Sequence, residues 1–149
     1  MKELLIVRGL PGSGKSTIAK QIQDTFGGVI VCADDFWGPA YAFDKSRIQE
    51  AHDWAYRQCE AHMQWNEERI ILDGTYAQLK WMARYVEMAT HFGYRAICRE
   101  PDTEWAWNPR QCAEKNVHGV SEDVINTMLS KWENPALNEN WAALARLLG

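Results

Sequence analysis

Short apolar runs alternate along the chain with longer segments in which apolar residues recur every three or four positions. Runs without polar interruptions predict strands that are covered on both faces, because a half-exposed strand would alternate apolar and polar residues. The intervening segments, with their helical spacing, predict helices. We therefore expect strands at residues 4–7, 29–33, 70–72 and 94–98, with helices at 16–25, 46–63 and 75–92 between them.

This alternation predicts the α/β class: a short parallel sheet with helices on both faces, a three-layer sandwich. The 149 residues suit a single domain with one continuous core. Two helix starts carry the signature of a capping box, Ser46 with Gln49 and Thr75 with Gln78.

Beyond the fourth expected strand the pattern changes. Residues 101–107 are irregular, Asn108 and Pro109 suit the N-cap and first position of a helix, and Gly119 breaks the pattern again. We expect a mobile lid over residues 101–120. Two C-terminal helices are expected over 121–148, one from Ser121 to 133 and one over 138–148.

Residues 9–16 carry the strongest functional signal, because they match G-x-x-x-x-G-K-[ST] and directly follow the first strand. Glycines let such a loop turn tightly and aim its N–H groups at one point, and the next helix adds its positive end there. Lys15 then reaches the β- and γ-phosphates of a nucleotide, and the Ser16 hydroxyl binds Mg²⁺. The motif therefore predicts ATP and Mg²⁺, held by Gly9, Leu10, Pro11, Gly12, Ser13, Gly14, Lys15, Ser16 and Thr17.

Carboxylates follow two of the strands, at the edge where ligands bind in open α/β sheets. Asp34 and Asp35 end the second strand, where a carboxylate accepts the proton of an incoming hydroxyl or simply caps a turn. Asp73 ends the third strand, at the Walker B position that binds Mg²⁺; its alternative is a turn residue before Gly74. Thr75 suits either a substrate phosphate or the helix cap.

Positive charge for the transition state is expected from the lid, where Arg110, Lys115 and His118 lie in or beside broken structure. Each of them alternatively belongs to a solvated helix face. Two further arginines could supply positive charge: Arg8 precedes the phosphate loop, and Arg99 ends the fourth strand. In the alternative interpretation each of them only pairs with a surface carboxylate.

The chain contains eight tryptophans, most of which we expect in packing. Trp37 differs because it lies in an expected loop two residues beyond the Asp pair, and Trp105 and Trp107 lie near the lid. An indole ring at these places can stack on a base.

Composition limits the possible functions and locations of the protein. The net charge of −4 argues against a protein that grips long duplexes, which needs a basic stripe. Four widely spaced cysteines indicate reduced thiols and no disulfide-linked partner. No apolar stretch approaches the length of a membrane span, so we expect no membrane contact and a cytoplasmic location, in a cell or a virus-infected host.

At these residues the chain resembles the small P-loop kinases grouped with polynucleotide 5′-hydroxyl kinases, among them phage polynucleotide kinases. The resemblance covers residues 4–133 and rests on RGLPGSGKST, CADDFW, EAHDWAY, IILDGTY, EPDTEWAW and KNVHGV. It implies a P-loop NTPase fold, Asp34 as the general base, and Thr75 near the phosphate of the acceptor. It also implies that Lys115 and His118 stand where phage polynucleotide kinases carry lid arginines.

Three positions depart from the pattern of that family. Trp37 stands where phage polynucleotide kinases have an arginine for the substrate's phosphate, Tyr76 replaces an asparagine, and His118 replaces an arginine. A neutral ring makes no bidentate phosphate contact, so we expect Trp37 and Tyr76 to hold the acceptor in another way, with its base against the tryptophan.

The leading hypothesis is an ATP-dependent kinase that phosphorylates a hydroxyl of a nucleic acid or nucleotide. One alternative is a kinase of 5-hydroxymethyluracil bases in phage DNA, which would present the hydroxyl on the base. A small-molecule kinase and a non-catalytic ATP-binding switch also stay open, although a switch does not need an acceptor base such as Asp34. The choice between ATP and GTP and the oligomeric state stay open too.

Overall fold

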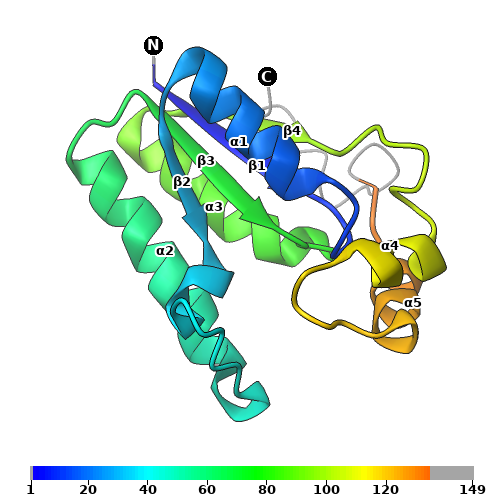
Figure 1. Cartoon of the computed structure of the whole chain (residues 1–149). Coiled ribbons are helices and arrows are strands. Elements are labelled where there is room, and N and C mark those ends of the chain that lie inside the picture. The colour runs from blue at the N-terminus through cyan, green and yellow to red at the C-terminus, as the bar shows by residue number, and fades with distance from the viewer. Residues whose placement is uncertain (1, 135–149) are drawn as a thin grey trace.

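A four-stranded parallel sheet forms the centre of the fold (Figure 1). The structure is a computed structural model that describes residues 2–134. Neighbouring strands are all parallel and follow the order β2-β3-β1-β4, so their carboxyl ends share one edge. The strands are β1 (Glu3–Arg8), β2 (Val29–Cys32), β3 (Arg69–Gly74) and β4 (Arg95–Arg99).

Helices cover both faces of the sheet, which confirms the expected α/β sandwich (Figure 1). One face carries α1 (Lys15–Phe26), and the other carries α2 (Ile48–Gln64) and α3 (Leu79–Phe92). Two short 3₁₀ helices, η1 (Ala33–Trp37) and η2 (Lys45–Arg47), connect β2 to α2. The pair α4 (Pro109–Lys115) and α5 (Glu122–Ser130) packs together beyond β4.

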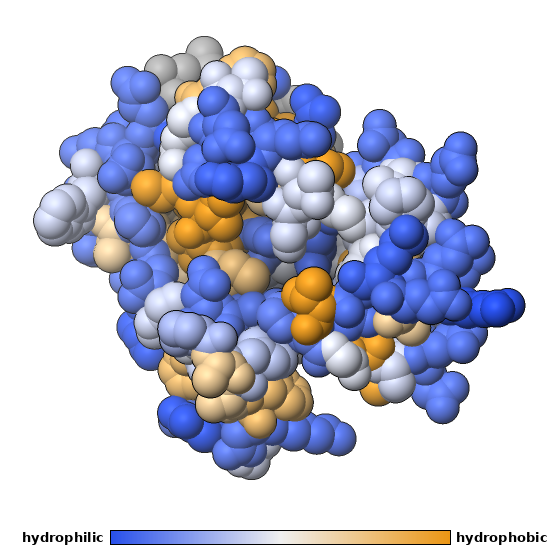
Figure 2. All heavy atoms as spheres, viewed as in Figure 1, coloured by the Kyte–Doolittle hydropathy of each residue, from blue (hydrophilic) through white to orange (hydrophobic). Residues whose placement is uncertain are grey.

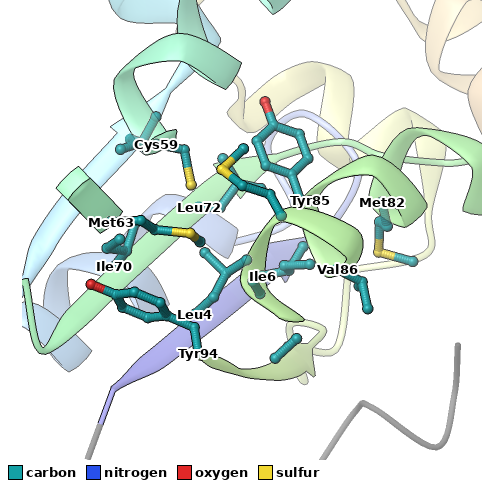
Figure 3. Packing of buried hydrophobic residues seen from close by; sticks show 14 of the residues in the cluster. Leu4, Ile6, Cys59, Met63, Ile70, Leu72, Met82, Tyr85, Val86 and Tyr94 are labelled. Carbon is teal, nitrogen blue, oxygen red and sulfur yellow. The ribbon is translucent and has the colours of Figure 1, made fainter. Parts of the chain in front are cut away.

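Alternate side chains of β1 face opposite helical layers, which explains why the whole strand is apolar. Leu4 and Ile6 pack with Met63 of α2 and Met82 of α3 in the main core, where all four are almost fully buried (Figure 3). Val7 belongs to the smaller cluster on the α1 side. On that side apolar side chains remain in view beside β2, whereas the outer surface of α1 is hydrophilic (Figure 2).

Both capping boxes expected from the sequence are wrong. Ahead of α2, the side chain of Asp44 accepts hydrogen bonds from the Ser46 N–H at 3.0 Å and from the Ser46 hydroxyl at 2.7 Å, so Ser46 is itself capped. The N–H of Leu79, the first residue of α3, donates instead to Glu133 Oε1 at 2.9 Å. Thr75 therefore does not cap that helix.

The two helix starts in the second half are confirmed. The Asn108 side chain accepts from the Gln111 N–H at 3.0 Å, and the Ser121 hydroxyl accepts from the Val124 N–H at 3.3 Å. The helix from Ser121 ends at Ser130, before the predicted residue 133. The helix expected at 138–148 lies outside the described residues. Of the helices within residues 2–134, none has the length and apolarity to cross a bilayer.

The expected lid does not stand apart from the phosphate loop, because its first part packs against the loop. Leu10 of the loop is fully buried in a cluster with Cys112 of α4 and Ile125 of α5. After α4 the chain turns tightly: Asn116 Nδ2 donates to the Val120 carbonyl at 2.9 Å, and the Val120 N–H donates to Asn116 Oδ1 at 2.8 Å. Residues 101–116 thus pack against the phosphate loop and form one wall of it.

Candidate active site

The phosphate loop joins the end of β1 to the start of α1. Gly12 and Gly14 adopt φ angles of 80° and 103°, in the left-handed region that favours glycine. Gly14 is the N-cap of α1, so the N–H groups of the first turn, from Lys15 onward, have no partner within the helix. An anion at this point meets those N–H groups and the positive end of the helix.

Two side chains from the wall hold the loop from outside. Trp105 Nε1–H donates to the Gly12 carbonyl at 3.0 Å, and the Thr103 hydroxyl donates to the Ser13 carbonyl at 2.8 Å. Because C=O and N–H point in opposite directions in a trans peptide, the N–H of Gly14 faces away from Thr103 and into the loop. Thr103 was not among the residues expected to have a role. Both side chains therefore fix the direction of the loop's peptide groups.

Ser16 and Asp73 meet where the loop faces the end of β3. The Ser16 hydroxyl donates to Asp73 Oδ2 at 2.9 Å. Asp73 is 5% exposed, and within the part of the chain that the structure describes its Oδ1 has no hydrogen-bond partner. Mg²⁺ is commonly held by one or two protein oxygens together with phosphate oxygens and water. This hydroxyl and this unsatisfied carboxylate oxygen fit such an ion.

The charged side chains of Lys15, Asp34 and Asp35 lie around the Asp73 carboxyl. Burial, the largest cause, raises the pKa of Asp73; Lys15 and the Ser16 hydrogen bond oppose the shift, and Asp34 and Asp35 add to it. Lys15 and both other aspartates therefore lie close enough to act on one group. Asp35 also has a raised pKa, because of burial and the charge of Asp34. One edge of the sheet thus combines a cation for phosphates with three carboxylates.

Asp34 lies in η1, directly after β2, and 41% of its side chain is exposed. The Tyr41 hydroxyl donates to Asp34 Oδ1 at 3.3 Å, and His118 Nε2 lies 3.6 Å from Asp34 Oδ2. The structure therefore brings the lid residue His118 to the expected base. Sequence reasoning missed Tyr41, whose one signal is the Gly38 turn that directs the chain back toward Asp34.

The other expected lid cations lie farther out. Lys115 Nζ is 4.2 Å from the ring centroid of Trp105, so it lies beside the support of the phosphate loop. Arg110 is 79% exposed and pairs with Glu114 of the same helix at 3.6 Å, which is the solvated helix face left open as the alternative. Thr75 lies half-buried directly after β3, and its contact with an acceptor stays a prediction.

The side chains of Trp37 and Tyr76 are buried in packing, and their contact with a substrate stays a prediction. Trp37 is 7% exposed, and its ring meets Phe36 and Phe43 edge-on with centroid distances of 5.1 Å. Tyr76 is 8% exposed within the main core, beside Tyr85. Both residues follow strand ends, but their rings turn inward to apolar neighbours.

The two other tryptophans considered for base stacking also have packing partners. Trp105 supports the loop and carries Lys115 on its ring. Trp107 packs edge-on against Trp132 with centroids 5.0 Å apart. Base stacking by these rings stays a prediction without a contact in its favour.

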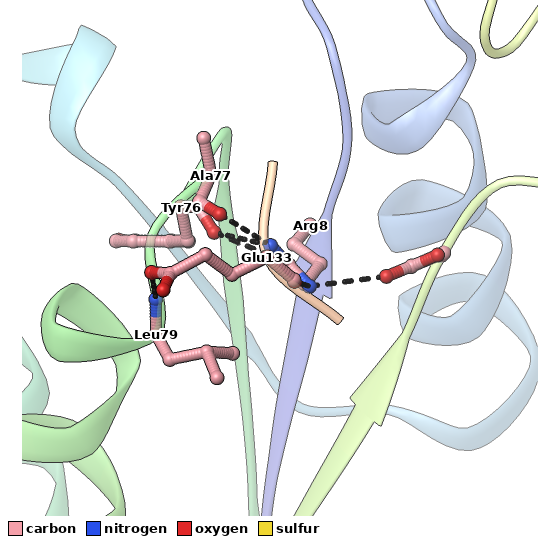
Figure 4. A network of polar contacts seen from close by, with 6 residues as sticks. Arg8, Tyr76, Ala77, Leu79 and Glu133 are labelled. Carbon is pink, nitrogen blue, oxygen red and sulfur yellow. Dashed lines mark hydrogen bonds and ion pairs between the residues drawn. The ribbon is translucent and has the colours of Figure 1, made fainter. Parts of the chain in front are cut away.

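Arg8, for which a pair with a surface carboxylate was the alternative to a functional role, is fully buried. Its guanidinium donates to the carbonyls of Tyr76, Ala77 and Glu133 over 2.8–3.1 Å, and to Glu100 Oε1 at 3.1 Å (Figure 4). Burial lowers the pKa of Arg8, and nearby anionic groups oppose that shift. Arg8 thus fastens the strand before the phosphate loop to the chain after β3 and after α5.

A glycine-rich loop between β1 and α1, with carboxylates at the ends of neighbouring parallel strands, defines a P-loop kinase fold. The family comparison agrees with this class. The chain belongs to the AAA domain family, whose model matches residues 4–135.

Individual curated proteins and solved structures are also similar to this chain. NEDD4-binding protein 2 of Homo sapiens is 38% identical over 133 residues, which cover 87% of this chain and 8% of that protein. A chain of the Pnkp1/Rnl/Hen1 RNA repair complex matches with a TM-score of 0.63 at 24% identity, over 87% of this chain and 43% of its own length. A gluconokinase from Sinorhizobium meliloti 1021 matches with a TM-score of 0.64 at 14% identity, over 97% of this chain and 88% of its own. At these identities, the two structures show a shared fold.

Proposed function

We propose that this chain is an ATP-dependent kinase that transfers the γ-phosphate to a hydroxyl of a nucleic acid or nucleotide, with Asp34 as the general base. One observation carries the proposal: Lys15, the Ser16–Asp73 pair and Asp34 converge on one edge of the sheet. An acceptor of this class is supported by the similar fold of a chain from an RNA repair complex.

The proposed reaction divides its tasks among these residues. The loop amides, the start of α1 and Lys15 hold the phosphates of ATP. Asp34 takes the proton of the acceptor hydroxyl while the oxygen of that hydroxyl bonds to the γ-phosphorus. The bond from the γ-phosphorus to the bridging oxygen breaks, which releases ADP. Mg²⁺, held by Ser16 and Asp73, supplies charge compensation when it is bound. Lys115 and His118 are proposed to add positive charge at the transferred group.

Asp34→Asn tests the base. A general base contributes about 100- to 10,000-fold to rate, so we expect kcat for phosphoryl transfer to fall by that factor. The affinity for ATP should change by less than about twofold, because the Asp34 carboxylate contacts Tyr41 and His118, which lie outside the phosphate loop. Asp24→Asn is the matched control, since Asp24 is an exposed carboxylate near the far end of α1 that pairs with Lys20. Full activity of Asp34→Asn would exclude Asp34 as the base.

The acceptor is identified with ATP labelled on its γ-phosphate and two substrates. One is an oligonucleotide with a 5′-hydroxyl, and the other is DNA that contains 5-hydroxymethyluracil and has phosphorylated ends. Label in the first substrate supports an end-directed kinase, and label in the second alone supports phosphorylation of the base. A gluconate or nucleoside product would instead indicate a small-molecule kinase. Tight ATP binding with no labelled acceptor would favour a non-catalytic switch.

A further inference from the structure

Three aromatic rings stack beside Asp34. The Tyr41 ring lies in the middle, with the His118 ring 3.9 Å away at 17° and the Phe43 ring 5.9 Å away at 10°, measured between centroids. Phe43 is 50% exposed, and 34% of the His118 side chain is exposed, so both ends of the stack reach the surface. The stack joins the segment after β2 to the turn after α4.

The His118 imidazole shows what this place accepts. It is a flat nitrogen heterocycle that lies face to face on Tyr41, with Nε2 at 3.6 Å from Asp34 Oδ2. A nucleobase has the same shape and chemistry, and stacking on an aromatic side chain is its ordinary mode of recognition in single strands. His118 lies in a turn next to Gly119, whose φ of 69° marks it as a loop residue outside any helix.

We infer that Tyr41 recognises the acceptor: a nucleobase stacks on the face of Tyr41 that His118 covers here, and the acceptor hydroxyl then lies at Asp34. The inference rests on the proposed function and narrows its acceptors to compounds that carry a base. The inference also gives each oxygen of the Asp34 carboxylate a separate role. Oδ1 accepts from the Tyr41 hydroxyl, which leaves Oδ2, on the side of His118, for the proton of the acceptor.

The backbone of Tyr41 supports a role beyond packing. Its φ of 48° lies in the left-handed region, which is uncommon for a bulky side chain and persists only where the surroundings fix it. Those surroundings are the buried Trp37, whose carbonyl accepts from the Ala42 N–H at 3.1 Å, and Gly38, whose carbonyl accepts from the Tyr41 N–H at 3.0 Å. Strain held beside an expected base is typical of a functional position.

The Tyr41 hydroxyl also keeps its proton, with which it donates to Asp34. Burial and the charge of Asp34 raise the pKa of Tyr41 to about 12, so the hydroxyl stays a donor to Asp34 through the neutral range. The contact therefore orients the carboxylate without competing for the proton of the acceptor.

Binding of two fluorescent oligonucleotides tests the inference without requiring turnover. One is six-nucleotide thymidylate with a 5′-hydroxyl and a 3′-fluorescein; the other has the same backbone without bases and so the same phosphate charge. Anisotropy gives the Kd of each in the presence of Mg²⁺ and a non-hydrolysable ATP analogue. We expect the base-free strand to bind wild type more weakly, by about 5- to 150-fold, the factor that one stacked base contributes.

Variants assign this difference to Tyr41. Tyr41→Leu should weaken thymidylate binding by that same factor and leave the base-free strand unchanged, whereas Tyr41→Phe, which keeps the ring, should bind thymidylate within about twofold of wild type. Phe26→Leu is the matched control, because Phe26 is an aromatic residue, 67% exposed, at the end of α1. Equal binding of the two strands by wild type, or equal losses for both strands in Tyr41→Leu, would overturn the inference.

The outcomes separate this inference from the proposed function. Phosphorylation of both strands with equal KM would refute the role of Tyr41 and leave the kinase intact. Base-dependent binding without phosphorylation of any acceptor would refute the kinase and leave the stacking site.

Discussion

The buried guanidinium of Arg8 gives the sharpest test of what holds the site in place. Arg8→Met keeps most of the side-chain volume and removes every donor. It leaves the carbonyls of Tyr76, Ala77 and Glu133 without the hydrogen bonds that Arg8 makes at 2.8–3.1 Å. It also removes the contact of the guanidinium with the Trp132 ring, 4.1 Å from its centroid. Arg8→Met should therefore lower the free energy of unfolding by more than the loss of one surface contact would.

The magnitude follows from these contacts. The buried Tyr76 carbonyl loses both of its hydrogen bonds to Arg8, which costs about 1–3 kcal/mol, whereas the Ala77 carbonyl keeps the Glu133 N–H at 2.9 Å. Removal of the buried cation recovers part of this cost by ending its own desolvation. Glu100 is 37% exposed and is resolvated when its partner is lost. We expect the free energy of unfolding to fall by about 1–3 kcal/mol, the usual cost of leaving a buried acceptor unpaired. For a chain of this length that lowers Tm by about 2–12 °C.

Urea and thermal unfolding followed by circular dichroism measure this change. Arg99→Met is the matched control: Arg99 is an exposed arginine at the end of the neighbouring strand β4, and its loss should change the free energy by less than about 0.5 kcal/mol. If Arg8→Met and Arg99→Met unfold with the same free energy, the network around Arg8 does not stabilise the fold, and the reasoning from its carbonyl contacts is refuted.

Two further predictions concern the phosphate loop and the Ser16–Asp73 pair. Gly12→Ala should weaken ATP binding by at least about tenfold in calorimetry, because a Cβ there would clash with the Cys112 carbonyl. Gly27→Ala, with nearly the same φ and open space, should leave ATP binding unchanged. Asp73→Asn should abolish the Mg²⁺ dependence of ATP binding yet stabilise the nucleotide-free protein at pH 7, since burial raises the pKa of Asp73 and so penalises its charged form. That gain should shrink as the pH falls through the Asp73 pKa in unfolding experiments, and a gain independent of pH would contradict it.

The sheet, its helical layers and the phosphate loop were predictable because their signals are local. The apolar runs fix the strands, and the motif at 9–16 determines the loop by itself. The caps failed because better acceptors lay elsewhere: Asp44 just before Ser46, and Glu133, which reaches the start of α3 from beyond α5. The residue types around Thr75 carry no information about a hydrogen-bond acceptor such as Glu133, which lies so far along the chain.

Burial was the other quantity that the sequence did not determine at this edge. Trp37 was expected in a loop where its ring could stack on a base, but the 3₁₀ turn of η1 packs the ring against Phe36 and Phe43. No local signal marks Arg8 as buried, and arginine is rarely found inside a protein. Arg8 is inside because three backbone carbonyls from two distant segments converge on its guanidinium, a condition visible only in the folded chain.

The expected lid consists of two parts with different roles. Residues 101–116 are joined to the phosphate loop through Thr103, Trp105 and the buried Cys112, so movement of this part would disturb the loop itself. Residues 117–120 make a single turn, closed at its base by Asn116 and Val120, that carries His118 to Asp34. We therefore expect opening for an acceptor to involve this turn alone. A base that replaces His118 on Tyr41 would then displace one short loop while the phosphate site keeps its shape.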